Sequence, residues 1–123
     1  MSHLNQTVAA FNIRQYDQAA RQAAEGLAIA QGRDEAFWMG ILETCEGFSL
    51  LQAKNLMKAE QKLIAAMEKL RNFGFRYNNF EVTASLAGTR RCVEEIRVVR
   101  QTKGRIFDVS LLPQMRMAAR ADD

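Results

Sequence analysis

The sequence is poor in residues that end helices and make tight turns. It contains one proline, Pro113, and seven glycines among 123 residues, and three of the glycines, Gly32, Gly74 and Gly104, follow stretches with helical periodicity. Strands and hairpins need more turn chemistry than this, because each hairpin requires its own turn. The sequence therefore predicts an all-α fold of about five helices in stacked antiparallel hairpins.

Long apolar runs and an export signal are also missing. No stretch approaches the roughly 20 uninterrupted apolar residues that a membrane span requires, and the chain does not start with a basic and then apolar segment. Apolar residues make up 48% and charged residues 25% of the chain, which is the balance of a folded soluble protein. We expect one domain over residues 1–123, because the length is too short for two. The missing export signal leads us to expect a cytoplasmic protein.

Cysteine and histidine are too scarce to build a disulfide framework or a metal site. Cys45 and Cys92 are expected to be reduced thiols of a cytosolic protein, although neighbouring arginines would lower the pKa of Cys92 if it were exposed. The only histidine, His3, has no partner at ligand spacing and lies near a chain end, where residues tend to be unstructured. No phosphate-binding loop or nucleophile–base pair is present. We predict no metal, no cofactor and no enzymatic activity.

Apolar residues recur at helical spacing in five stretches. Asp34 is the expected N-cap of the third helix, and Gly32 the left-handed cap that ends the second. Residues 75–80 read as a polar and aromatic connector before a fifth helix, which Gly88 weakens and Gly104 stops. The five expected helices cover residues 4–13, 16–31, 34–51, 55–73 and 81–101.

The chain matches itself at an offset of 40 residues. Residues 11–32 and 51–74 share an order of residue types: a large apolar residue, a basic turn residue, an aromatic residue or leucine, and then small residues at helical spacing. Small residues let a neighbouring helix approach closely, so the repeat predicts two helical hairpins side by side, although amphipathic helices also align by chance. The aligned pairs are Phe11/Leu51, Arg14/Lys54, Tyr16/Leu56, Ala19/Ala59, Ala23/Leu63, Gly26/Ala66 and Leu27/Met67.

The same part of the chain resembles a known family. The segment FWMGILE at residues 37–43, followed by Asn55, Ala59 and Leu70, is similar to the middle of the DUF309 family of small bacterial and archaeal helical domains. Phe11 and the segment YDQA that begins at Tyr16 look like the family's upstream phenylalanine and its aromatic-x-Glu-Ala start. The resemblance covers residues 11–73 and implies a bundle of hairpins related to tetratricopeptide repeats (TPR-like).

The departures from that family concern its polar residues. Where the family carries a His-Glu pair, a further Glu and a Trp, this chain has Ala20, Arg21, Ala24 and Leu27. In addition, Glu43 replaces a glutamine, and Lys54 replaces a turn glycine. The resemblance therefore implies a diverged member that keeps the scaffold without the family's polar centre.

One acidic pair is a candidate for chemistry. Glu43 and Glu46 lie three residues apart on the third predicted helix and point in one direction. They could poise a proton or bind a cation if they faced a cleft. A solvated helix face is the favoured interpretation, because glutamate is mostly exposed and nothing else completes a catalytic set.

Positive charge is concentrated near the end of the chain. Residues 85–105 hold six Lys/Arg and two Asp/Glu, whereas residues 1–54 hold four and six. A basic fifth helix over residues 81–101 would attract an acidic protein partner, nucleic acid or an anionic membrane surface. Alternatively, Arg90 or Arg91 could pair with Glu94 or Glu95 within the chain. Nucleic acid is disfavoured because stacking aromatics are absent from the helix. The predicted contact residues are Arg90, Arg91, Arg97 and Arg100, with Tyr77 and Phe80 on the connector.

The tail, residues 105–123, is unusually apolar for a segment that follows the last helix. It could fold back into the groove between the hairpins, which we favour, or dock a second subunit in a homodimer. Together these patterns predict a non-catalytic protein-interaction or assembly module that binds a protein partner through a helical groove and a basic helix.

Overall fold

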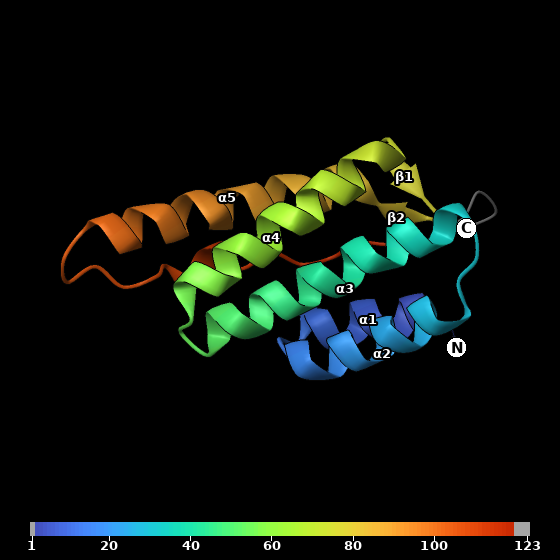
Figure 1. Ribbon diagram of the computed structural model, residues 1–123, viewed down its shortest axis with the longest axis horizontal. Coiled ribbons are helices and arrows are strands. Elements are labelled where there is room, and N and C mark those ends of the chain that lie inside the picture. The colour runs from blue at the N-terminus through green and yellow to red at the C-terminus, as the bar shows by residue number, and fades with distance from the viewer. Residues whose placement is uncertain (1, 120–123) are drawn as a thin grey trace.

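Residues 2–119 are described by a computed structural model, and they form five α-helices that pack as an antiparallel succession. Figure 1 shows α1 and α2 on one side of the molecule, α3 in the middle, and α4 and α5 on the other side. The predicted all-α bundle is confirmed. The helices are α1 (His3–Asn12), α2 (Tyr16–Ile29), α3 (Arg33–Gln52), α4 (Leu56–Leu70) and α5 (Val82–Gln101).

The junction between α2 and α3 differs from the prediction. Helix α2 already ends at Ile29, so Gly32, with a φ of 62°, lies at the N-cap of α3 and not at the end of α2. Asp34 is consequently inside the first turn of α3, where its carboxylate still suits the helix dipole. No helix within residues 2–119 combines the length and apolar character needed to cross a membrane.

The turns that join α1 to α2 and α3 to α4 have the same backbone structure. The N–H of Arg14 donates to the carbonyl of Phe11, and the N–H of Lys54 donates to that of Leu51, each at 2.9 Å. The next residue in each turn makes a second equivalent bond, of 3.0 and 2.9 Å. Arg14 and Lys54 both have left-handed backbone, with φ of 63° and 66°. The offset of 40 residues therefore relates two turns of the same geometry.

Helices α3 and α4 approach each other closely at two glycines of α3, Gly40 and Gly47. A Cβ atom at Gly47 would lie 2.5 Å from Cδ2 of Leu63, and one at Gly40 would lie 2.8 Å from Cγ of Leu70. Both leucines are buried and fill the space that the glycines leave. Ala59, which aligns with Ala19 in the repeat, is also fully buried. Gly40 and Gly47 thus set the spacing of these helices, and neither is among the small residues of the predicted repeat.

The connector between α4 and α5 is more ordered than expected. Strands β1 (Arg76–Tyr77) and β2 (Phe80–Glu81) pair antiparallel around the two-residue turn of Asn78 and Asn79. Both asparagines have positive φ, at 49° and 63°, as a tight hairpin turn requires. A 3-10 turn, Arg71–Phe73, precedes the hairpin.

The tail folds back along the molecule, as favoured from its composition. After a 3-10 turn at Val109–Leu111 it runs behind the helices towards the β hairpin (Figure 1). The amide of Asn12 donates to the carbonyl of Met115 at 2.9 Å and accepts from its N–H at 2.7 Å. Met117 then bridges to Phe80. Residues 120–123 of the predicted tail lie outside the described residues.

We predict that Gly47→Ala destabilises the protein by about 1–3 kcal/mol, because the added methyl group overlaps a packed leucine. Chemical denaturation measures the change. In a Leu63→Ala background the same substitution should cost little or stabilise, since the space is free and alanine favours helix by about 1 kcal/mol. An equal cost in both backgrounds would show that contact with Leu63 does not set this helix spacing.

We predict that Asn12→Ala loosens the tail at a cost of about 1–3 kcal/mol, because two buried backbone groups of Met115 lose their partner. The substitution should accelerate hydrogen exchange at the Met115 amide more than it accelerates exchange in α3. Asn5→Ala, at an exposed position on the same helix, is the matched control. Unchanged exchange at Met115 would contradict a clamping role for Asn12.

Candidate binding sites

The basic fifth helix divides into paired and unpaired arginines. Glu60 on α4 lies 2.9 Å from Nε of Arg97 and 2.7 Å from Nη1 of Arg100. The hydrogen bonds from Arg97, and then those from Arg100, hold the pKa of Glu60 below its usual value. Arg90 and Arg91 are exposed and make no ion pair with any residue in the range 2–119.

A shallow groove of about 350 Å³ lies between α4 and α5. Half-buried and buried apolar residues from both helices form part of its lining. Three arginines and two glutamates supply the charges around them. The lining consists of Ile64, Met67, Leu86 and Val93 with Arg71, Arg90, Arg97, Glu68 and Glu94. Arg90 and Arg97 therefore share one surface, whereas Arg91 and Arg100 lie outside this lining.

The connector aromatics belong largely to the core. Phe80 is completely buried, so its predicted role as a contact residue is wrong. Its ring packs on Phe37, and the tail covers it through the bridge to Met117. Tyr77 is half-buried, packs against Phe37, and donates its hydroxyl hydrogen bond to Asp34. That hydrogen bond is the main reason that the pKa of Tyr77 is raised.

Glu43 and Glu46 form ion pairs between α3 and α4. Oε1 of Glu43 lies 2.6 Å from Nζ of Lys69, and Oε1 of Glu46 lies 3.3 Å from Nζ of Lys62. Neither glutamate lines the groove between α4 and α5 or either of the two larger cavities at the ends of the molecule. The favoured interpretation of a solvated helix face is wrong for Glu43, whose side chain is only 14% exposed between α3 and α4, whereas that of Glu46 is 40% exposed.

Both cysteines are buried and unpaired. Burial raises the pKa of Cys92 to about 12 and raises that of Cys45 well above its usual range. Cys92 also donates a 3.3 Å hydrogen bond to the carbonyl of Leu111 in the tail. The neighbouring Arg91 lowers the pKa of Cys92 less than burial raises it, so the arginines do not activate this thiol.

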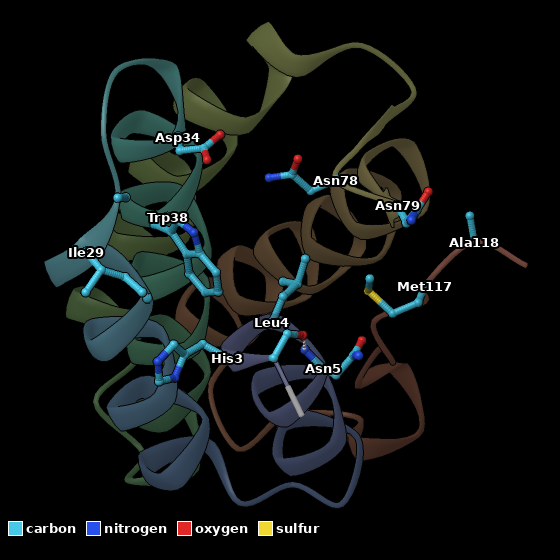
Figure 2. A pocket seen from close by; sticks show the side chains of 13 residues that line it. His3, Leu4, Asn5, Ile29, Asp34, Trp38, Asn78, Asn79, Met117 and Ala118 are labelled. Atoms are coloured by element: carbon cyan, nitrogen blue, oxygen red, sulfur yellow. Dashed lines mark hydrogen bonds between the residues drawn. The ribbon is translucent and has the colours of Figure 1, made fainter. Parts of the chain in front are cut away.

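A cavity of about 720 Å³ lies at the end of the molecule that contains the start of α3 and the β hairpin. Figure 2 shows Trp38 between Asp34 and His3, with Asn78 and Asn79 across the cavity. Trp38 fits in this position because Gly26 has no side chain. A Cβ atom at position 26 would lie only 2.7 Å from the Trp38 ring. The lining mixes polar and apolar residues about equally around this one indole.

The titratable groups of this cavity already have partners. Asp34 accepts the Tyr77 hydrogen bond, and Nδ1 of His3 lies 3.3 Å from Oε1 of Gln22 and 3.6 Å from Oε2 of Glu25. His3 is the first residue of α1, so the expectation of an unstructured position is wrong. The described residues include no group of three or more His, Cys, Asp or Glu that could hold a metal ion.

A second cavity, of about 520 Å³, lies at the opposite end, between the two repeat turns and the beginning of the tail. Its lining is mainly apolar, with three basic residues and no acidic residue. Tyr16 is part of the lining, and its buried hydroxyl oxygen has no hydrogen-bond partner. The lining residues are Arg14, Tyr16, Phe48, Leu51, Gln52, Lys54, Leu56, Val99, Arg105, Ile106, Phe107, Val109 and Leu112.

Sequence reasoning did not identify this second cavity as a site. The available signal was the basic residue that both repeat turns share, at Arg14 and Lys54. Comparisons with protein-family models, with curated proteins and with solved structures found no match to this chain. The surfaces described above are therefore the basis on which function is argued.

We predict that neither thiol reacts quickly with a disulfide reagent at pH 8 in the native protein, because their raised pKa values leave almost no thiolate. Cys92 should be modified before Cys45, since release of the tail exposes the former and only unfolding of the bundle exposes the latter. Peptide mapping by mass spectrometry checks the order. Equal rates under native conditions would contradict it, and the denatured protein provides the control for intrinsic reactivity.

Proposed function

We propose that the protein is a non-catalytic interaction module whose groove between α4 and α5 binds an acidic, amphipathic segment of a protein partner. The observation that carries this proposal is the groove itself, which joins apolar side chains to Arg71, Arg90 and Arg97. A helix or extended segment with apolar residues on one face would bury them there, and acidic residues beside that face would meet the arginines. We place this activity in the cytoplasm, because Cys45 and Cys92 remain separate thiols.

The ion pairs of α5 compensate part of its positive charge. The proposed partner would therefore meet a small basic region and not a broad basic surface. Glu60 neutralises much of the charge of Arg97 and Arg100, so Arg90 and Arg71 are the groove arginines without an ion pair within residues 2–119. Glu68 and Glu94 on the same groove would repel unselective anions and favour a partner with matching charges. A second copy of the chain is one such partner to test.

Nucleic acid is the second candidate, since exposed Arg90 and Arg91 could contact phosphates. Phosphate contacts make affinity fall steeply with salt. Titration of duplex DNA and single-stranded RNA at about 50 and 200 mM salt tests this. Tight binding with a steep salt dependence, abolished by Arg90→Glu/Arg91→Glu, would favour nucleic acid over a protein partner.

The main experiment places a photo-crosslinking residue at Glu94, on the groove. We expect it to capture protein segments that are acidic and amphipathic, and the segment's synthetic peptide should then bind the purified protein. Arg71→Glu/Arg90→Glu should weaken that peptide's affinity about tenfold or more, because each arginine becomes a like charge.

The matched control reverses two exposed charges elsewhere, Arg21→Glu on α2 and Lys58→Glu on α4. The control should bind the peptide as the unmodified protein does. Sedimentation of each variant reports whether the captured partner is a second copy of the chain. Undiminished peptide binding by Arg71→Glu/Arg90→Glu would refute the proposal.

A further inference from the structure

We propose that the cavity between the two repeat turns binds an amphipathic monocarboxylate, a ligand with an aliphatic body and one carboxylate head. This site is separate from the α4–α5 groove and lies at the end of the molecule where α1 meets α2 and α3 meets α4. Its volume of about 520 Å³ is in the range of small-molecule sites. The inference rests on the lining, on an unpaired hydroxyl and on two basic turn residues.

The apolar part of the lining determines the body of the ligand. Phe48, Leu51 and Leu56 come from the second repeat turn and its helices, and they face apolar residues of the tail and of α5 across the cavity. Ile106 is 85% exposed and Val109 60% exposed at this site. An aliphatic chain would cover this apolar surface, which is unfavourable to leave in water.

Tyr16 requires a hydrogen-bond acceptor. Its side chain is 1% exposed and packs edge-on against Phe11, yet the hydroxyl has no partner among the described residues. A buried polar group without a partner is costly, so such a hydroxyl marks a place where a bound molecule can supply one. Burial raises the pKa of Tyr16, which keeps the phenol a donor at neutral pH, and Arg14 is close enough to oppose that rise electrostatically. In the proposed complex, the anionic head group held by Arg14 supplies the acceptor that Tyr16 lacks.

The charges determine the head group. Arg14, Lys54 and Arg105 line the cavity, and no acidic residue does. Glu95 lies 2.9 Å from Arg105 and compensates its charge, whereas Arg14 and Lys54 have no ion-pair partner among residues 2–119. A guanidinium binds the two oxygens of a carboxylate in parallel, and the phenol adds a third donor. These charges disfavour a cationic ligand.

Backbone strain points to the same two residues. Arg14 and Lys54 adopt left-handed backbone, which asparagine or glycine adopts at lower cost. Both copies of the repeat nevertheless carry a long basic side chain there. The left-handed conformation itself ends α1 and α3, but glycine or asparagine is the usual residue there, so the basic side chains are what the turns do not require.

The test titrates the full chain with decanoate, below its micelle-forming concentration, by calorimetry and by NMR. We expect saturable binding at one site, with the largest shifts at Tyr16, Leu51 and Phe107 and none at Arg90. Decanol should bind at least about tenfold more weakly, and decyltrimethylammonium should not bind, because neither offers an anion to the cations.

Two variants separate binding from folding. Tyr16→Phe removes the unpaired hydroxyl and keeps the ring, so the melting temperature should be unchanged or higher while decanoate affinity falls about fivefold or more. Arg14→Gly relieves the left-handed strain and removes the cation, and it should have the same two effects. Binding of decanol as tight as that of decanoate, or full affinity in both variants, would overturn the proposal. Absence of any decanoate binding at millimolar concentration would overturn it as well, without affecting the α4–α5 groove.

Discussion

The close approach of α3 to α4 is the constraint on which the other features depend. It exists because Gly40 and Gly47 leave room for Leu70 and Leu63, and interiors of proteins tolerate little change in such packing. Helix α3 is also the neighbour of α2, so its position fixes both hairpins relative to each other. This contact positions the turn at Lys54, and that turn forms one wall of the cavity between the two repeat turns. The groove on the other side of α4 depends on it indirectly, through the orientation of α4.

Local patterns allowed the helices to be predicted, because helical periodicity and short turns are properties of neighbouring residues. The close contacts at Gly40 and Gly47 were not predicted. The offset of 40 identified Arg14 and Lys54 as equivalent before their backbone was known. The hairpin at Asn78 and Asn79 was missed although an asparagine pair favours a tight turn, since its flanking strands have only two residues each. The kinship with tetratricopeptide repeats stays a prediction.

Sequence reasoning failed where contacts between residues far apart in the chain determine the structure. Phe80 looked exposed because its sequence neighbours are polar, yet the tail returns from far along the chain to cover it at Met117. The sequence suggests Glu94 and Glu95 as local partners of Arg90 and Arg91, but no such ion pair forms among residues 2–119. Glu60, on another helix, binds Arg97 and Arg100 instead. Pairing across elements depends on tertiary structure, which a charge count along the sequence does not contain.

Natural sequences are locally consistent with their fold except where function demands otherwise. Four residues other than glycine have positive φ within residues 2–119, and the asparagine pair among them is what its hairpin requires. The other two, Arg14 and Lys54, end α1 and α3 in a conformation that glycine or asparagine usually provides, and both line the cavity where Tyr16 buries an unpaired hydroxyl. Selection for stability alone would remove these features, because glycine at the turns and phenylalanine at position 16 are simple substitutions. Their coincidence at one apolar cavity is best explained by a ligand that makes use of all three.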